Sequence, residues 1–307
     1  MKPPGPQRPL RFQNAKKRRG STARASVLYT GDKTLLSEIF LHITAIVYLL
    51  ATVIYSIYLF SRKDRFLPAA QWVFTAGFFF HTATVAARWI GAGRTPAASL
   101  HESLTFFSWI TVALYLLILV KYRQRVLGAF VSPFALLLLI TASLLPREIV
   151  PLAPALASYW LPVHVTLAFM GNAFFALAFF LGVMYIIQER YLKSRKLRGL
   201  YFILPSLEML DELNYKCLQY GFPLLTLAII TGAIWSEYAL GSYWLWRPRQ
   251  IWSLITWFLY AALLHGRLTS GWRGRKAAMF SGAAFLILIG SFLAINLLSG
   301  GAHGLAK

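Results

Sequence analysis

The stretch Trp160–Ile187, WLPVHVTLAFMGNAFFALAFFLGVMYII, decides the fold class. It contains no Asp, Glu, Lys or Arg over its whole length, and about 20 mostly apolar residues are enough to cross a bilayer as a helix. No apolar segment of the chain alternates as a β-barrel strand would. We therefore predict an all-α, polytopic integral membrane protein of about eight transmembrane helices. The eight apolar segments are expected at residues 37–60, 69–90, 102–120, 127–146, 160–187, 218–239, 250–267 and 278–298.

The composition of the whole chain agrees with this class. Of 307 residues, 58% are hydrophobic and 13% are charged, whereas soluble domains average about 45–50% and about 25%. The single cysteine, Cys217, excludes an internal disulfide and CxxC chemistry. The formal charge of +21 is typical of loops that face the cytoplasm and anionic lipid headgroups. No nucleic-acid motif accompanies this charge, so we do not expect nucleic acid as a partner.

The distribution of positive charge predicts an orientation. Sixteen Lys and Arg residues lie in one alternating set of loops, whereas six lie in the other set and the C-terminal tail. The positive-inside rule places the first set in the cytoplasm and both termini outside an inner or cytoplasmic membrane. The cytoplasmic set comprises loops 61–68, 121–126, 188–217 and 268–277, counting Arg267; the outer set comprises loops 91–101, 147–159 and 240–249, counting Arg88.

The N-terminal segment conflicts with this orientation. Residues 1–34 are rich in Lys, Arg, Pro and Gly, and we expect them to form a basic, disordered tail before a membrane domain at 35–307. Their nine positive charges would have to cross the membrane. Three explanations stay open: the first span is misassigned, the tail is translocated, or the true start lies downstream of Met1.

The loop before the seventh span is unusually aromatic. It reads WSEYALGSYWLWRPRQIWSLITW from Trp235 to Trp257 and holds five of the ten tryptophans. One interpretation is an aromatic belt at headgroup depth. The other is a flat apolar platform for a large planar ligand. The five residues are Trp235, Trp244, Trp246, Trp252 and Trp257.

Two histidines are expected on the same side of the membrane as this loop. His164 begins the fifth span and His303 follows the eighth, so the parity of the spans places them together. Imidazole is a common axial ligand of haem iron, and guanidinium groups match the carboxylates of haem propionates. The sequence thus predicts a haem site at the outer face. The candidate propionate partners are Arg94, Arg247 and Arg249.

Four segments resemble a known family in order along the chain. The stretch GAIWSEYALGSYWLWRPRQIWSLITWFLYAALLHGR, from Gly232 to Arg267, resembles the tryptophan-rich WWD domain of haem-handling proteins of cytochrome c maturation. The resemblance is to the CcsA/ResC type of System II, within a superfamily that includes HemX-like proteins. It extends over residues 40–305. The other matching segments are Arg88–Trp109, Trp160–Phe179 and Ser299–Leu305.

The resemblance implies roles for individual residues. His164 and His303 would be the external axial ligands, and the five tryptophans of segment 232–257 would hold the macrocycle. His265 would match an intramembrane histidine that receives haem first, and a ResB/CcsB-type membrane partner would supply the other ligand at that level. The implied function is a membrane component of c-type cytochrome biogenesis that binds haem b transiently and presents it at the outer membrane face. Apocytochrome c would bring the CxxCH thiols that form thioethers with the haem vinyl groups.

The core of the WWD segment departs from the family pattern. The usual Trp-Asp-Pro-Lys-Glu-Thr-Trp is here Trp246-Arg247-Pro248-Arg249-Gln250-Ile251-Trp252. Both acids are absent, which leaves open whether the chain is part of a holocytochrome c synthase (haem lyase). A HemX-like accessory or regulatory protein of tetrapyrrole supply is one alternative, and an assembly factor that binds no haem is another. A transporter is less favoured because broken helices and inverted repeats are not evident.

The remaining polar residues have structural interpretations. We expect His81 to form a hydrogen bond with another helix, and His42 and His101 to be interfacial or structural. Glu102, near the start of the third span, is expected to interact with the helix dipole. Three acids before the sixth span are expected to be solvated on an amphipathic segment, namely Glu208, Asp211 and Glu212.

Overall fold

The chain is helical throughout the residues described by the computed structural model, which are 10–149, 158–194 and 199–298. Within these ranges there is no strand, which confirms the predicted all-α class. Short 3-10 turns precede α4 and α6, at Arg125–Leu127 and Gly199–Phe202. The α-helices are α1 (Leu10–Ser61), α2 (Phe66–Ala92), α3 (Leu100–Tyr122), α4 (Gly128–Ser143), α5 (Trp160–Lys193), α6 (Leu207–Leu240), α7 (Pro248–Thr269) and α8 (Arg275–Leu298).

Seven of the described helices are long and apolar enough to cross a membrane, which confirms a multipass membrane protein. The helix outside this set is α2, because Gln71, His81 and several threonines lower its hydropathy. Helix α5 has 34 residues, or about 51 Å at about 1.5 Å per residue, so it exceeds the hydrocarbon core of about 30 Å. Helix α6 begins at Leu207 instead of the predicted 218, because Ser206 caps it by accepting a hydrogen bond from the Met209 backbone N–H.

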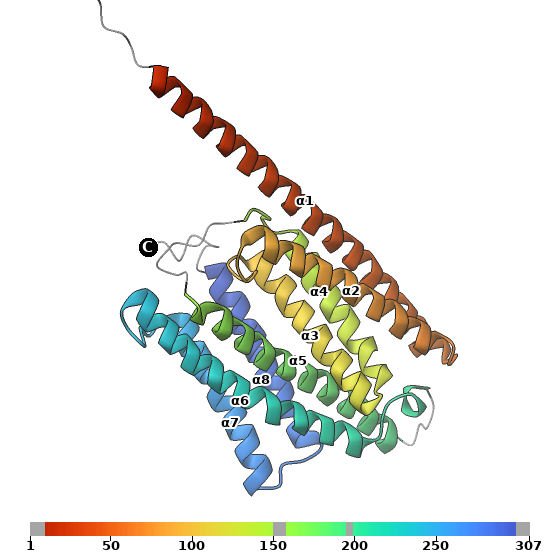
Figure 1. Ribbon diagram of the computed structural model, residues 1–307. Helices are drawn as coiled ribbons and strands as arrows, with labels where there is room; N and C mark the ends of the chain where they lie inside the picture. Colours follow the sequence, from red (N-terminus) through yellow and green to blue (C-terminus); the bar gives the residue numbers. More distant parts are fainter. Residues whose placement is uncertain (1–9, 150–157, 195–198, 299–307) are drawn as a thin grey trace, which may run out of the picture.

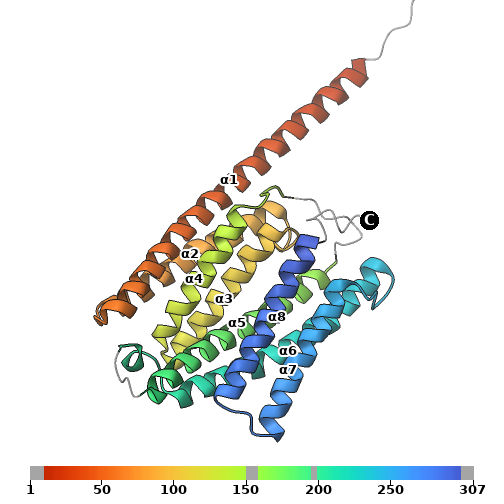
Figure 2. The same cartoon turned by 180° about the vertical axis from the view of Figure 1, so that it is seen from behind.

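The loops gather at two ends of the molecule. The α2–α3 connection, the start of α5, the α6–α7 loop and the last described turn of α8 lie at one end (Figures 1 and 2). The α1–α2, α3–α4 and α7–α8 connections lie at the other. This is the alternation predicted from the spans. We call these the outer end and the inner end, after the orientation predicted from the loop charges.

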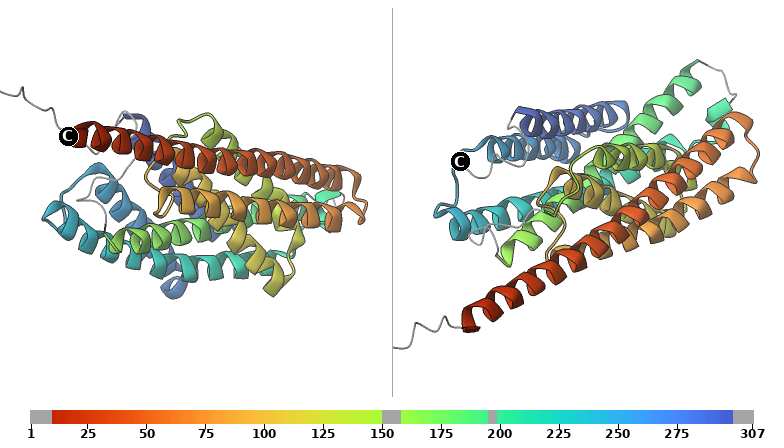
Figure 3. Two further views of the ribbon diagram at one scale, coloured as in Figure 1. Left: turned by 45° about the horizontal axis from the view of Figure 1, so that its top comes forward. Right: turned by 90° about the horizontal axis from the view of Figure 1, so that it is seen from above.

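The helices form two halves, α1–α4 and α5–α8. Figure 3 shows α1 and α2 at one flank and α7 and α8 at the opposite flank. Aromatic rings join the halves: Phe134 of α4 contacts Phe180 of α5 and Phe285 of α8 at centroid distances of 5.3 and 6.2 Å. Helices α5 and α6 meet closely at Gly171, where an added Cβ would lie 3.0 Å from the backbone nitrogen of Leu225. Small residues at such crossings are typical of membrane helices.

Helix α1 projects beyond the bundle at its N-terminal side (Figure 1). It is continuous from Leu10, so it includes most of the basic segment for which a disordered tail was expected. Side chains of α1 are described from Leu35 onward. The division of the chain into a 1–34 tail and a 35–307 domain therefore stays a prediction.

Candidate functional site

His164 is held against one face of α6. Its Nδ1 lies 2.8 Å from the carbonyl oxygen of Ala228. Gly232 lies one turn further along α6, and a Cβ there would be 2.6 Å from Cε1 of the imidazole. One turn beyond, the ring of Trp235 is parallel to the imidazole, with a centroid distance of 6.5 Å and an interplanar angle of 3°. The spacing of 228, 232 and 235 places these three groups on one helix face.

This arrangement fixes the proton on the His164 ring. A carbonyl oxygen can only accept, so Nδ1 carries the hydrogen and Nε2 keeps its lone pair. No hydrogen bond to Nε2 occurs among the described residues. Imidazoles that bind metals usually donate their other N–H to a carbonyl or carboxylate in this way. The ring therefore has the tautomer that an axial ligand of haem iron requires.

The aromatic loop lies between α6 and α7 at the outer end. Gly241 ends α6 in the left-handed region (φ 72°), and its N–H bonds to the carbonyl of Glu237. Trp246 also has a positive φ, 53°, and is 69% exposed. Such a backbone costs a bulky residue about 1–3 kcal/mol and is typical of functional loops. Trp246 meets Trp244 edge to face at 5.9 Å, and the indole N–H of Trp244 is buried without an acceptor among the described residues.

Gln250 stabilises the turn at the start of α7, within the altered WWD core. Its side-chain oxygen accepts the backbone N–H of Leu245 at 2.9 Å and of Arg247 at 3.4 Å. A carboxylate at this third helical position closes a capping box in the same way. Arg247, at the N-cap, makes no side-chain cap. Gln250 thus holds the turn at the start of α7, whereas Arg247 contributes no side-chain cap.

The other candidates in the WWD segment divide into exposed and packed residues. Arg247 and Arg249 are exposed, and neither forms an ion pair within the described ranges. Trp252 is half-buried in the first turns of α7. Trp257 packs on α6, where its indole N–H donates to the Thr226 hydroxyl at 2.9 Å. Trp257 therefore connects α7 to α6 by this hydrogen bond.

His265 lies on the outward face of α7. Its side chain is exposed, on the same face as other exposed residues of the helix, including Ile255, Phe258 and Leu268. The structure does not bring His265 together with His164. The prediction for His303 lies outside the described residues; the described part of α8 ends at Leu298, at the same end of the molecule as the start of α5, the helix that carries His164 (Figure 2).

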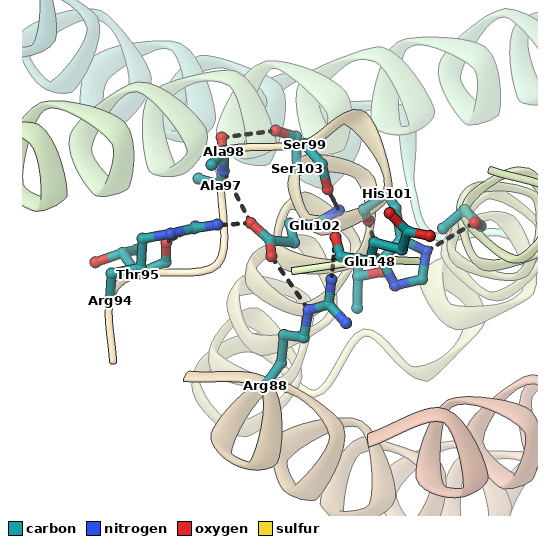
Figure 4. Close-up of polar contacts among 12 residues, drawn as sticks. Arg88, Arg94, Thr95, Ala97, Ala98, Ser99, His101, Glu102, Ser103 and Glu148 are labelled. Carbon is teal, nitrogen blue, oxygen red and sulfur yellow. Dashed lines mark hydrogen bonds and ion pairs between the residues drawn. The ribbon is translucent and has the colours of Figure 1, made fainter. Parts of the chain in front are cut away.

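A buried ion cluster joins α2 to α3 at the outer end of the other half (Figure 4). Glu102, 1% exposed, binds Arg88 Nε at 3.1 Å through Oε1. Its Oε2 binds Arg94 Nη1 at 2.9 Å and the backbone N–H of Ala98 at 2.9 Å. The N-cap of α3 is Ser99, whose hydroxyl accepts the Glu102 backbone N–H. Glu102 is thus the centre of an ion-pair network, and Arg94, a candidate for a propionate, is already engaged.

The histidines of α2 and α3 are structural, as predicted. His81 is fully buried; its Nδ1 lies 3.1 Å from the Tyr48 hydroxyl and its Nε2 lies 3.1 Å from the Thr105 carbonyl. His101 is 5% exposed and bonds through Nδ1 to the Ala142 carbonyl at 2.8 Å. With both ring nitrogens occupied, His81 has no lone pair left for a metal.

Two positions of interest were missed from the sequence. Gly232 carries no polar group, and its contact with His164 depends on how α5 crosses α6. Asp211, predicted to be solvated, instead forms an ion pair with Arg267 of α7, with Nη2 2.6 Å from Oδ2. That prediction was wrong because the first turns of α6 lie beside the end of α7. Glu208 and Glu212 do lie at less buried positions, and Glu212 pairs with Lys216 on α6.

These features define a class of protein: a polytopic helical membrane protein in which an imidazole, hydrogen-bonded through one ring nitrogen, lies at the same end as a tryptophan-rich loop. Residues 97–303 match the family of cytochrome c assembly proteins, which includes α3 to α8. The chain belongs to this family.

Relatives and a solved structure agree with this membership. The chain is 37% identical over 223 residues to "Cytochrome c biogenesis protein CcsA" of Chlamydomonas reinhardtii, with 70% of this chain and 62% of the relative covered. It is 31% identical to the protein of the same name from Synechocystis sp., with 87% of this chain and 96% of the relative covered. The structure of "Cytochrome c Heme Lyase CcmF" superposes with a TM-score of 0.63 at 18% identity, covering 89% of this chain and 51% of that one. The latter likeness shows a shared fold.

Proposed function

We propose that this protein is a membrane component of c-type cytochrome biogenesis that binds haem at its outer end and presents it to apocytochrome c. The relatives named for cytochrome c biogenesis support the process. The observation that carries the haem proposal is the state of His164. Its Nδ1–H is committed to the Ala228 carbonyl, and its Nε2 is free within the described residues.

The residues at the outer end fit haem as a cargo. His164 would bind the iron on one side and His303 would bind it on the other. Trp235 is parallel to the imidazole, and Trp244, Trp246 and Trp252 would supply apolar area for the macrocycle. The haem propionates would bind the exposed side chains of Arg247 and Arg249 and the indole N–H of Trp244, which has no acceptor among the described residues. Haem supplies the vinyl groups to which the CxxCH thiols add to form thioethers.

The role of this chain in that reaction is positioning. Ala228 and Gly232 orient the imidazole, and Gln250 holds the loop that carries Trp244 and Trp246. A macrocycle held in one orientation presents its vinyl edge to the thiols. Part of the entropic cost of alignment is then met when haem binds, which lowers the barrier to thioether formation. A bound haem b held without covalent bonds can then leave with the cytochrome.

The position of His265 is an argument for a membrane partner near the inner end. An imidazole facing out of the bundle within a membrane span is costly unless it meets another polar group or a metal. An axial haem ligand at this position would need a second ligand from another chain. A ResB/CcsB-type membrane protein would supply it, and haem would pass from this level to the outer site.

Visible spectra test the proposal. The detergent-purified protein, oxidised and reduced, is compared with a His164→Ala/His303→Ala double variant and with His265→Ala. We expect a haem absorption band that is lost or shifted in the double variant. A colourless wild type from haem-replete cells would reject haem binding and support a HemX-like accessory role. Reconstitution with the partner and an apocytochrome then measures whether thioethers form.

A further inference from the structure

Helix α7 has two sharply different faces. The inward face contains Tyr260, Leu263 and Arg267, which are 0%, 1% and 9% exposed. His265 is two residues from both Leu263 and Arg267, which is about 200° around the helix at 3.6 residues per turn. Whatever holds Leu263 and Arg267 inward therefore turns His265 outward.

Helix α7 buries a small share of its residues in the bundle. In its most apolar window 28% of the residues are buried, compared with 56% in α5 and 33% in α6 and α8. Among the described residues, hydrogen bonds between side chains connect α7 to α6 at two levels: Trp257 with Thr226, and Arg267 with Asp211. A helix with a small buried share depends more on such directional contacts for its rotation.

The contact at the inner end is built like a clamp. Arg267 binds the Asp211 carboxylate with both terminal nitrogens, at 2.9 and 2.6 Å, and Nη2 also donates to the Asp211 carbonyl at 3.1 Å. The same carboxylate accepts the backbone N–H of Gly274 at 2.8 Å. The guanidinium lies over the ring of Tyr215 at 4.5 Å. The carboxylate thus ties α6, α7 and the α7–α8 connection together at one point.

The turn after α7 adds to this fixed point. The indole of Trp272 covers Gly266, where an added Cβ would lie 2.6 Å from Cδ2. The backbone N–H of Trp272 bonds to the Gly266 carbonyl at 3.1 Å. Gly266 is the residue between His265 and Arg267, so the backbone at this level is held on both sides of the clamp.

We propose that the Asp211–Arg267 clamp is a positioning device that sets the rotation of α7 and thereby directs His265 out of the bundle toward a membrane partner. The partner and the haem rest on the proposed function, whereas the rotation does not. Arg267 suits this task because its planar guanidinium forms two parallel bonds, which a lysine ammonium does not.

The rotation is tested by cysteine reactivity in membranes. His265→Cys and Leu263→Cys are each labelled with a membrane-permeant maleimide, with the wild type as a blank because Cys217 is 2% exposed. We expect Cys at 265 to react about tenfold faster than Cys at 263, since the two positions lie on opposite faces. Adding Asp211→Asn reduces this contrast to about twofold or less, because the bidentate bond is lost. Glu212→Gln is the matched control and keeps the full contrast.

The outcomes separate the clamp from the proposed function. An unchanged contrast in folded Asp211→Asn overturns the clamp, whether or not the protein binds haem. If Asp211→Asn does not fold, Arg267→Lys is used instead, because it keeps the positive charge without the planar guanidinium that forms two parallel bonds. An intermediate difference in labelling rate between positions 265 and 263 then supports the clamp, and an undiminished difference overturns it. If the wild type holds haem, we expect the spectral component lost in His265→Ala to decrease in Asp211→Asn and to return in Asp211→Glu. A colourless wild type rejects the proposed function alone.

Discussion

The two halves of the molecule differ in the contacts that their histidines make. In α1–α4, His81 bonds through both ring nitrogens, and Glu102 satisfies two arginines and a backbone N–H. In α5–α8, His164 bonds through one nitrogen, and His265 faces outward. Histidines within membrane spans are costly unless they are paired. In the first half, His81 is paired within the bundle through both nitrogens, whereas in the second half His164 keeps a nitrogen lone pair available.

The difference distinguishes a histidine that connects helices from the histidines that we propose bind haem. A ring whose two nitrogens are both bonded connects helices. A ring with one donor committed to a carbonyl and one free acceptor is ready for a metal. His81 is fully buried and His164 is half-buried. What the second ring nitrogen faces distinguishes them: in His81 it faces the Thr105 carbonyl and in His101 the Glu38 carboxylate, whereas in His164 it has no partner among the described residues.

The largest effect should follow from removing the imidazole of His164. His164→Gly is expected to lower haem per protein by about tenfold or more, because an axial bond is lost. Added imidazole should restore part of the absorption band through the space that the ring leaves. Pyridine haemochrome assays measure the haem content. If His81→Gly removed haem to the same extent in folded protein and imidazole rescued it, the distinction between the halves would fail.

The ion cluster of the first half should show a large effect on stability instead. Glu102→Ala leaves Arg88, 4% exposed, and Arg94 without their carboxylate, at a cost of about 3–5 kcal/mol. We expect a lower thermal midpoint in detergent and an unchanged haem spectrum of the protein that stays folded. Thermal unfolding followed by size-exclusion chromatography measures the first quantity. The double variant Arg88→Met/Glu102→Leu removes the ion pair itself and should recover part of the loss.

A smaller effect is expected at Gly232. Gly232→Ala places a Cβ 2.6 Å from the His164 ring, so the imidazole must move away from the Ala228 carbonyl. We expect about two- to tenfold weaker haem binding and a shifted reduction potential, because the hydrogen bond that tunes the ligand is altered. Haem titration and spectroelectrochemistry measure these changes. Gly290→Ala in α8 is the control, since a Cβ there meets no atom within 4 Å; equal effects in the two variants would argue against a specific role of Gly232.

The smallest effect is expected at the capping residue of α7. Gln250→Ala removes the acceptor of two backbone N–H groups, which costs about 0.5–2 kcal/mol. We expect faster proteolysis of the outer loop and a small loss of haem. Gln250→Glu should preserve the turn, because a carboxylate accepts the same two N–H groups. If Gln250→Glu were as susceptible to protease as Gln250→Ala, the capping role would be wrong.

Part of the site could be predicted from the sequence and part could not. Parity alone placed His164 and the tryptophan-rich loop at one end, and the predicted hydrogen bonding of His81 is confirmed. The Asp211–Arg267 pair spans 56 residues, and no local pattern connects positions so far apart. Gly232 has no side chain whose chemistry would draw attention. The partners of Glu102 were missed because a carboxylate in the first helical turn already has a local explanation in the helix dipole.

The sequence by itself determined the helical membrane class, the approximate spans and the family, because hydrophobic length and motif order are properties of the chain in one dimension. The tertiary structure decided which ring nitrogens are occupied, which face of α7 carries His265 and which acid is paired. These depend on how helices cross and rotate against one another. A shift of one residue turns a side chain by about 100°, and the packing of neighbouring helices, not the local pattern, selects that angle.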